Sequence, residues 1–96
     1  MPLVFEWNPW KARENQRKHG VSFDEASSVF DDPLAKVFSD DDHSNGEQRE
    51  IIFGSSIMNR LLLVSFTERA RNRIRIISAR QATKREQKEY EENIDT

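Results

Sequence analysis

The chain contains no cysteine, which excludes a disulfide scaffold, a zinc-thiolate site and a cysteine nucleophile. Only 3 of its 96 residues are glycine, and they lie far apart, so no glycine-rich loop cradles a nucleotide phosphate. No apolar run approaches the roughly 18 residues that a membrane-spanning helix needs, and the N-terminus lacks the pattern of a signal peptide. We therefore expect a soluble, cytoplasmic protein without a cofactor.

Hydrophobic residues are also scarce. They make up 35% of the sequence, and charged residues make up 33%, whereas globular domains average about 45–50% and 25%. A chain this short cannot supply two separate hydrophobic cores. We expect residues 1–96 to form a single domain with a thin core and modest stability.

The charges are segregated, although the net charge is only −2. Residues 31–59 carry seven acids and two bases, whereas residues 60–88 carry nine bases and two acids. The basic block has two interpretations, a solvated surface with salt bridges or a face that binds phosphate. Its many arginines favour the second, because a guanidinium offers a planar fork of donors that suits phosphate oxygens.

Three helices are predicted from capping signals. Asn8 and Pro9 begin a helix over residues 9–18. Capping boxes at residues 22–25 and 83–86 begin the other two, one near the N-terminus and one at the C-terminal end.

The helix over residues 9–18 is unusually polar. Its candidate core anchors are Trp10 and Ala12, besides the proline. Lys11, Asn15 and Lys18 recur at i, i+4 and i+7, so they share one face of the helix.

Five short segments have the composition of strands, and their ranges are 4–7, 34–38, 50–54, 61–68 and 73–79. The last three are separated by gaps of turn length, which favours an antiparallel meander over βαβ units. The predicted class is therefore α+β. We expect an antiparallel sheet of four to five strands, with two N-terminal helices and a C-terminal helix.

A three-residue turn at 70–72 predicts the register of the last hairpin. Phe66 then lies opposite Ile76, and Val64 opposite Ser78, on the face that packs in the core. The other face becomes an exposed patch with these pairs: Thr67 opposite Arg75, and Arg69 opposite Arg73. Opposed like charges destabilise a sheet, so this patch indicates a bound anion.

Arg80, Thr83 and Lys84 lie just before or at the start of the last predicted helix. Free amides at a helix N-terminus attract anions, so these residues resemble an anion site. Two alternatives stay open. Thr83 can serve only as the helix cap, and Arg80 can form a salt bridge with a glutamate of the same helix.

The two histidines do not indicate a metal site. His43 adjoins Asp40, Asp41 and Asp42, but the pattern of a calcium-binding EF-hand loop is not met. His19 follows the first helix and can cap its last carbonyls. Alternatively, it is the only candidate proton acceptor near neutral pH outside the acidic loop.

Several segments together resemble the BrnT family of ribonuclease toxins. They are Phe5-Glu6-Trp7-Asn8-Pro9, Lys11-Ala12, Asn15, Lys18-His19-Gly20-Val21-Ser22-Phe23-Asp24-Glu25-Ala26, Val29-Phe30-Asp31-Asp32-Pro33, Thr67-Glu68-Arg69, Arg73 through Thr83, Glu86 and Tyr90. The likeness extends over nearly the whole chain. One departure is Ala70-Arg71-Asn72, where the family often has a turn with glycine.

The resemblance implies a RelE/ParE-like fold and an RNA-cleaving toxin of a type II toxin–antitoxin system. It implies two kinds of partner, a cognate BrnA-like antitoxin and an RNA substrate. The expected assembly has two toxins and an antitoxin dimer. DNA would be contacted only through the antitoxin, and no membrane would be involved.

The residues suit an endoribonuclease that needs no metal, because RNA supplies its own nucleophile, the 2′-OH. The protein must orient that hydroxyl, accept its proton and stabilise charge on the phosphate. We expect guanidinium groups to converge on one RNA linkage. The predicted roles are charge stabilisation by Arg69, Arg75 and Arg80, proton acceptance by Glu68 or His19, orientation of a phosphate oxygen by Thr67, and backbone guidance by Lys11, Lys18, Arg73 and Lys84.

Two other functions fit the same sequence. A ParE-like toxin would poison gyrase by contact and cleave no RNA. An inactive member would act only as a co-repressor that binds the antitoxin, with its arginines receiving an acidic segment of that partner.

Overall fold

A computed structural model describes residues 2–41 and 46–94 of the chain. The elements, in order, are β1 (Val4–Glu6), α1 (Pro9–His19), α2 (Phe23–Ser28), the 3-10 turn η1 (Val29–Asp31), β2 (Lys36–Ser39), β3 (Glu50–Ser55), β4 (Leu61–Ala70), β5 (Arg73–Gln81) and α3 (Lys84–Ile94). Asp42 and His43 of the acidic loop, where no metal site was predicted, lie outside the described residues. Among the described helices, none has both the length and the apolar character to cross a membrane.

The five strands form one sheet in the order β1-β5-β4-β3-β2. Strands β3, β4 and β5 form the predicted antiparallel meander, and β2 pairs antiparallel to β3 at its edge. Strand β1, however, runs parallel to β5, with Val4 opposite Arg73 and Glu6 opposite Arg75. The sheet is therefore mixed, and the expectation of a purely antiparallel sheet is wrong at this edge. Two helices separate β1 from β2, so no hairpin turn dictates the direction in which β1 pairs.

The predicted capping signals all operate. The Asn8 side chain accepts hydrogen bonds from the amides of Trp10 at 2.9 Å and Lys11 at 3.2 Å. Ser22 caps α2 by accepting from the Glu25 amide at 3.0 Å. Gly20 ends α1 with φ +68°, a left-handed conformation that favours glycine. Side chains a few positions away therefore fix where these helices begin and end.

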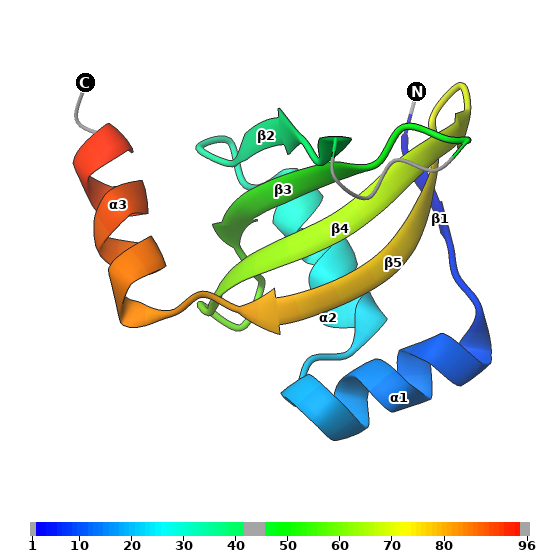
Figure 1. Ribbon diagram of the computed structural model, residues 1–96, viewed down its shortest axis with the longest axis horizontal. Helices are drawn as coiled ribbons and strands as arrows, with labels where there is room; N and C mark the ends of the chain where they lie inside the picture. The colour runs from blue at the N-terminus through cyan, green and yellow to red at the C-terminus, as the bar shows by residue number, and fades with distance from the viewer. Residues whose placement is uncertain (1, 42–45, 95–96) are drawn as a thin grey trace.

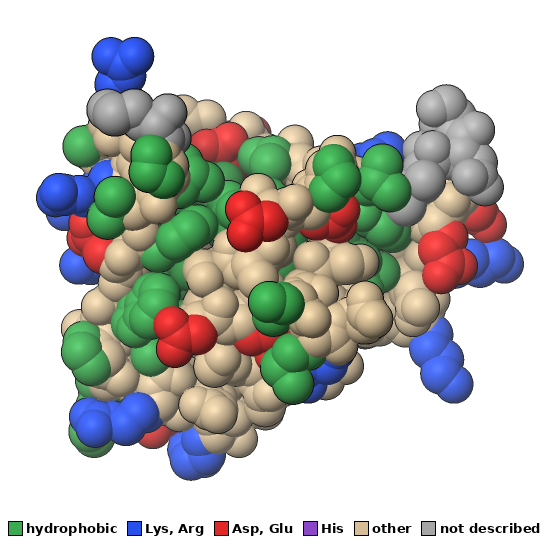
Figure 2. Space-filling view, turned by 180° about the vertical axis from the view of Figure 1, so that it is seen from behind, with side chains coloured by type: hydrophobic (Ala, Val, Ile, Leu, Met, Phe, Trp, Pro, Cys, Tyr) green, Lys and Arg blue, Asp and Glu red, His purple; other side chains and the backbone are tan. Residues whose placement is uncertain are grey.

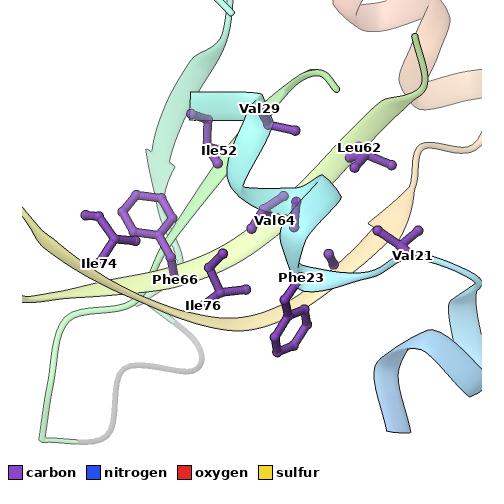
Figure 3. Close-up of a cluster of buried hydrophobic side chains, with 11 residues drawn as sticks. Val21, Phe23, Val29, Ile52, Leu62, Val64, Phe66, Ile74 and Ile76 are labelled. Atoms are coloured by element: carbon purple, nitrogen blue, oxygen red, sulfur yellow. The ribbon is translucent and has the colours of Figure 1, made fainter. Parts of the chain in front are cut away.

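The hydrophobic core lies between the sheet and the segment formed by α2 and η1, which covers one face of the sheet (Figure 1). Figure 3 shows apolar side chains of β3, β4 and β5 meeting those of α2 and η1. Phe30 packs between Phe5 and Phe66, with ring centroids 5.1 and 5.0 Å apart. Trp7 packs edge-on against Phe23. Such aromatic pairs add to the stabilisation that burial supplies.

Trp10 is not a core residue. Its side chain is 66% exposed, so the prediction that it anchors α1 is wrong. The tryptophan that packs is Trp7, which precedes the helix. Helix α1 is held instead by partly buried Ala12 and buried Asn15.

The β4–β5 hairpin keeps part of the predicted register and departs from the rest. Phe66 pairs with Ile76 and Thr67 with Arg75, as predicted, whereas Val64 pairs with Ala79 and Ala70 with Arg73. The connection is a two-residue turn, because Asn72 adopts φ +64°, which asparagine tolerates better than most residues. Arg69 is consequently an extra residue in a bulge and does not oppose Arg73. Ile77 is the extra residue of a second bulge, between the pairs Phe66–Ile76 and Ser65–Ser78.

A buried charge cluster fastens α2 to the β3–β4 connection. The Arg60 guanidinium contacts both carboxylate oxygens of Glu25 and donates to the Gly20 carbonyl at 3.0 Å. Ser56 donates to Glu25 at 2.7 Å. The Glu25 side chain is only 4% exposed, so its charge depends on these partners.

Helix α3 lies at one end of the sheet (Figure 1). Buried Tyr90 anchors it by stacking on Phe53 with centroids 4.8 Å apart. The Tyr90 hydroxyl also donates to the Leu34 carbonyl at 3.1 Å. Burial and the nearby Asp32 carboxylate raise the pKa of this phenol. The face of β4 and β5 turned toward the viewer in Figure 1, opposite α2, is crossed by no helix of the described residues.

Candidate functional site

The open face of the sheet carries most of the predicted arginines. Register places Arg75 opposite Thr67 and Arg80 opposite Leu63 on this face, away from the core residues Val64 and Phe66. Four residues of β4 separate the two positions, which is about 13 Å along the strand. The backbone positions that carry the Arg75 and Arg80 side chains are therefore far apart on the sheet.

Glu6 bridges two of these arginines. Its carboxylate lies 3.3 Å from Arg75 Nε and 3.6 Å from Arg73 Nε. The parallel pairing of β1 with β5 creates this contact by setting Glu6 directly opposite Arg75. Sequence reasoning missed Glu6, because the partner of β1 was not predictable from local pattern.

The segment before β3 covers the same end of the face, on the far side of Arg75 from β1, where Thr67 pairs with Arg75. Glu47 pairs with Arg69 at 2.9 Å, and the Gln48 carbonyl accepts a hydrogen bond from Thr67 Oγ1 at 2.8 Å. Thr67 is only 2% exposed, so its predicted position on an exposed patch is wrong. The backbone that crosses it takes the place that a phosphate was expected to fill.

Glu86 engages Arg80 through two hydrogen bonds, at 2.8 and 2.9 Å. The same carboxylate accepts from the Thr83 amide at 2.9 Å, while Thr83 Oγ1 accepts from the Glu86 amide at 3.1 Å. Hydrogen bonding by Arg80 is the main reason why the pKa of Glu86 falls to about 2. Arg80 therefore forms a salt bridge with a glutamate of the last helix, and Thr83 caps that helix. These are the two alternatives to an anion site that the sequence left open. Lys84 is exposed at the first position of α3.

Glu68 lies on the other side of the sheet from Arg75. It pairs with Ile74, a core residue, and its own side chain is exposed where the sheet ends. The alternation of side chains along β4 thus turns Glu68 away from the open face.

The predicted arginines do not form a cluster of unpaired guanidinium groups. Arg69, Arg73, Arg75 and Arg80 each have a carboxylate within 4 Å. The expected convergence of bare guanidinium groups on one point is not present. Arg73 and Arg75 share one carboxylate, and Arg69 and Arg80 have their own.

A different group of predicted residues does come together. An open hollow of about 190 Å³ lies between α1 and β5, lined by Lys11, Glu14, Asn15, Lys18, His19, Ile77 and Ser78. Three residues predicted to act on RNA, Lys11, Lys18 and His19, meet there. Within the described residues, neither lysine forms a salt bridge within 4 Å, and the nearby charge of Lys18 helps to lower the pKa of Glu14. Ser78 pairs with Ser65 on the open face, two residues before Arg80.

Asn15 fixes α1 to β5 at this hollow. Its side chain accepts from the Ala79 amide at 3.0 Å and donates to the Ala79 carbonyl at 2.8 Å. It also donates to the Val21 carbonyl at 3.0 Å. The amide thus occupies a part of the β5 edge that β1, which pairs only with residues 73–75, does not reach.

We define the α1–β5 surface as Lys11, Lys18 and His19 of α1 with Arg75, Ser78 and Arg80 of β5. Lys11, Lys18, His19 and Ser78 line the hollow together with Glu14. Arg75 and Arg80 do not line it; they lie on β5, three residues before and two residues after Ser78. Such a set can bind phosphate and exchange a proton. Within the part of the chain that the structure describes, no group of three or more metal-ligating side chains occurs.

A mixed five-stranded sheet with a helical layer on one face defines a small α+β domain. The crystal structure of the Brucella abortus ribonuclease toxin BrnT superimposes with a TM-score of 0.64 over 88% of this chain and 99% of that chain, at 23% sequence identity. The sequence model for "Ribonuclease toxin, BrnT, of type II toxin-antitoxin system" matches residues 7–86. The chain belongs to this family, and a type II system implies a protein antitoxin as its partner. No curated protein sequence matches the chain.

Proposed function

We propose that this protein is an endoribonuclease that needs no metal ion, that acts at the α1–β5 surface, and that inhibits translation and growth by cleaving RNA. The observation that carries the proposal is the meeting of Lys11, Lys18 and His19 at one hollow in a member of a ribonuclease-toxin family. A fold of the RelE type belongs to the same proposal.

The proposed reaction uses the nucleophile of the substrate. His19 accepts the proton of a ribose 2′-OH, and the 2′ oxygen forms a bond to the adjacent phosphorus. The bond from phosphorus to the 5′ oxygen breaks, and that oxygen takes up a proton from water. The products are a 2′,3′-cyclic phosphate and a 5′-hydroxyl. Lys11 and Lys18 hold the phosphates so that the 2′-OH is aligned for attack.

Arg75 is the first candidate for stabilising charge on the phosphate. Its bond to Glu6 is long, at 3.3 Å, and its side chain is 40% exposed. Exposed ion pairs of this kind contribute about 0–1 kcal/mol, so a phosphate can replace Glu6 at little cost. Arg80 is held by two bonds to Glu86 and is harder to release.

The remaining predicted residues divide into two groups. Arg69, Arg73 and Lys84 stay in the proposal as exposed guides for the RNA backbone. Thr67 and Glu68 take no part in it, because Thr67 is buried and Glu68 points away from the open face.

We further propose a BrnA-like antitoxin as the partner, in an assembly of two toxins with an antitoxin dimer. The antitoxin would carry the DNA-binding function, and it would neutralise the toxin by binding it.

The test uses purified protein and a defined RNA, with products mapped by primer extension and by analysis of their ends. His19→Ala should lower the cleavage rate by about 10²-fold or more, since positioned proton transfer contributes about 10²–10⁴-fold. Lys18→Gln should raise KM. Lys88→Gln, at an exposed lysine of α3, is the matched control and should cleave at the wild-type rate.

The two alternative functions, a gyrase poison and an inactive co-repressor, predict different damage to RNA and DNA after brief expression of the protein in cells. DNA breaks with intact RNA would identify a ParE-like toxin that poisons gyrase. Intact RNA and intact DNA would identify a co-repressor. Either result would overturn the proposed activity.

A further inference from the structure

Trp10 presents a large apolar ring to solvent on the outer side of α1. It is 66% exposed, and on a helical wheel it lies opposite Ala12 and Asn15, the residues by which α1 packs. The ring is not among the residues of the hydrophobic core, so it is accessible to a ligand.

Arg13 lies over one face of the Trp10 ring. Its guanidinium carbon lies 5.4 Å from the Trp10 ring centroid, a cation–π contact. No aromatic ring among the described residues stacks on Trp10. With Arg13 over one side, a flat ligand can stack on the other.

The surroundings of Trp10 favour an anionic ligand. Helix α1 carries four Lys or Arg residues and one acid, Glu14. Arg17 pairs with Glu14 at 2.8 Å. In the described part of the chain, Lys11, Arg13 and Lys18 form no salt bridge within 4 Å, although Lys18 lies near enough to Glu14 to lower the pKa of that carboxyl. An exposed aromatic ring beside several cations is the combination that binds single-stranded nucleic acid, since the bases stack and the phosphates pair with the cations.

The large apolar side chains typical of a protein-binding surface lie elsewhere. Ile57 and Met58, in the β3–β4 connection, are 81% and 63% exposed. Val37 and Phe38 are exposed on the edge strand β2. Seen from behind, hydrophobic side chains lie across the middle and along the left side of the surface, and most Lys and Arg side chains lie at its margins (Figure 2). A protein partner therefore has better contacts away from α1.

We propose that Trp10 is a stacking platform for one unpaired base of the RNA, next to the phosphates held by Lys11 and Lys18. This inference rests on the proposed function and specifies the substrate further, as a single strand at the position that α1 contacts. Trp10 then contributes to substrate binding and takes no part in bond cleavage.

The test measures binding without cleavage. A labelled 12-nucleotide RNA of mixed sequence, 2′-O-methylated so that it cannot be cut, is titrated with protein and followed by anisotropy. Trp10→Ala and Trp10→Leu should each weaken binding by about 5- to 30-fold, which is about 1–2 kcal/mol. Trp10→Phe, which keeps an aromatic face, should stay within about threefold of wild type. Met58→Ala, at another exposed apolar residue, is the control and should change nothing.

The outcomes separate this inference from the activity on which it rests. Wild-type affinity in Trp10→Ala, with RNA still cleaved, would overturn the stacking platform alone. A wild-type protein that neither binds nor cleaves RNA would overturn the proposed function. Weaker binding of the antitoxin by Trp10→Ala, with RNA affinity intact, would assign the ring to a protein interface and overturn the inference. Trp10→Leu also discriminates, because affinity close to wild type would mean an apolar contact without stacking.

Discussion

Replacing Asn15 by alanine tests how α1 is held against the sheet. The wild-type side chain makes three buried hydrogen bonds, two with the backbone of Ala79 and one with the carbonyl of Val21. Asn15 is only 6% exposed, so water does not readily replace it. Asn15→Ala leaves one buried amide and two buried carbonyls without these partners.

The expected loss follows from counting these bonds. Each contributes about 1 kcal/mol, so the free energy of unfolding should fall by about 3 kcal/mol. For a domain of this size, 1 kcal/mol corresponds to about 4–8 °C in Tm, which gives a decrease of roughly 12–24 °C. RNA cleavage should also decrease at temperatures where the variant is still folded, because Lys18 and His19 would lose their fixed place beside β5.

Urea unfolding followed by circular dichroism measures the stability, and a cleavage assay at low temperature measures the activity. Gln16→Ala is the matched control, because Gln16 is the exposed neighbour on the same helix, and should change stability by less than about 0.5 kcal/mol. A loss below about 0.5 kcal/mol for Asn15→Ala would refute the claim that this amide fastens α1 to β5.

Three further variants test the fold. Arg60→Met leaves the Glu25 carboxylate, which is 4% exposed, without its main partner, so the urea midpoint should fall clearly below that of the wild type; adding Glu25→Gln should recover part of this loss, and no recovery would contradict the pairing. Glu86 has a folded pKa of about 2 against an ordinary 4.5, so its carboxylate stabilises the fold fully above pH 4.5 and progressively less as the pH falls toward 2. After allowance for partial exposure this is about 1–2 kcal/mol, and Glu86→Gln should flatten that part of the stability–pH curve measured by thermal melts. A Cβ at Gly54 would lie 2.8 Å from Ala35 Cβ and 2.9 Å from Asp32 Oδ2, so Gly54→Ala should lower stability by about 1–3 kcal/mol; an unchanged Tm would show that these neighbours move freely.

Local signals in the sequence were sufficient for most of the elements. Asn8, Ser22 and Thr83 cap helices in the structure as predicted, because a cap depends only on residues within about three positions. The meander was predictable for a similar reason, since short gaps between strands force antiparallel neighbours.

Features that depend on distant residues were not predictable in the same way. The parallel pairing of β1 brings Glu6 to Arg75, 69 residues later, and no turn between them specifies it. Asn72 closed a tighter turn than expected and shifted Arg69 out of register. Trp10 and Trp7 look equally apolar in sequence, and only the packing around Phe23 distinguishes them.

The candidate site follows the same division. Helical spacing correctly grouped Lys11, Asn15 and Lys18 on one side of α1, and the structure adds His19 and Ser78 to them. The arginines were identified as a group, but their carboxylate partners come from β1, α3 and the segment before β3. Charge partners that are remote in sequence cannot be read from composition.

The central claim is that the nucleophile belongs to the RNA and that this protein activates it. The most direct measurement places one 2′-deoxyribose at a mapped cleavage site in an otherwise unchanged RNA. We predict no cleavage at that linkage, normal cleavage at other sites, and 2′,3′-cyclic phosphate ends on the unmodified RNA. Cleavage of the deoxy linkage at the ordinary rate, or products with 3′-hydroxyl and 5′-phosphate ends, would contradict the account.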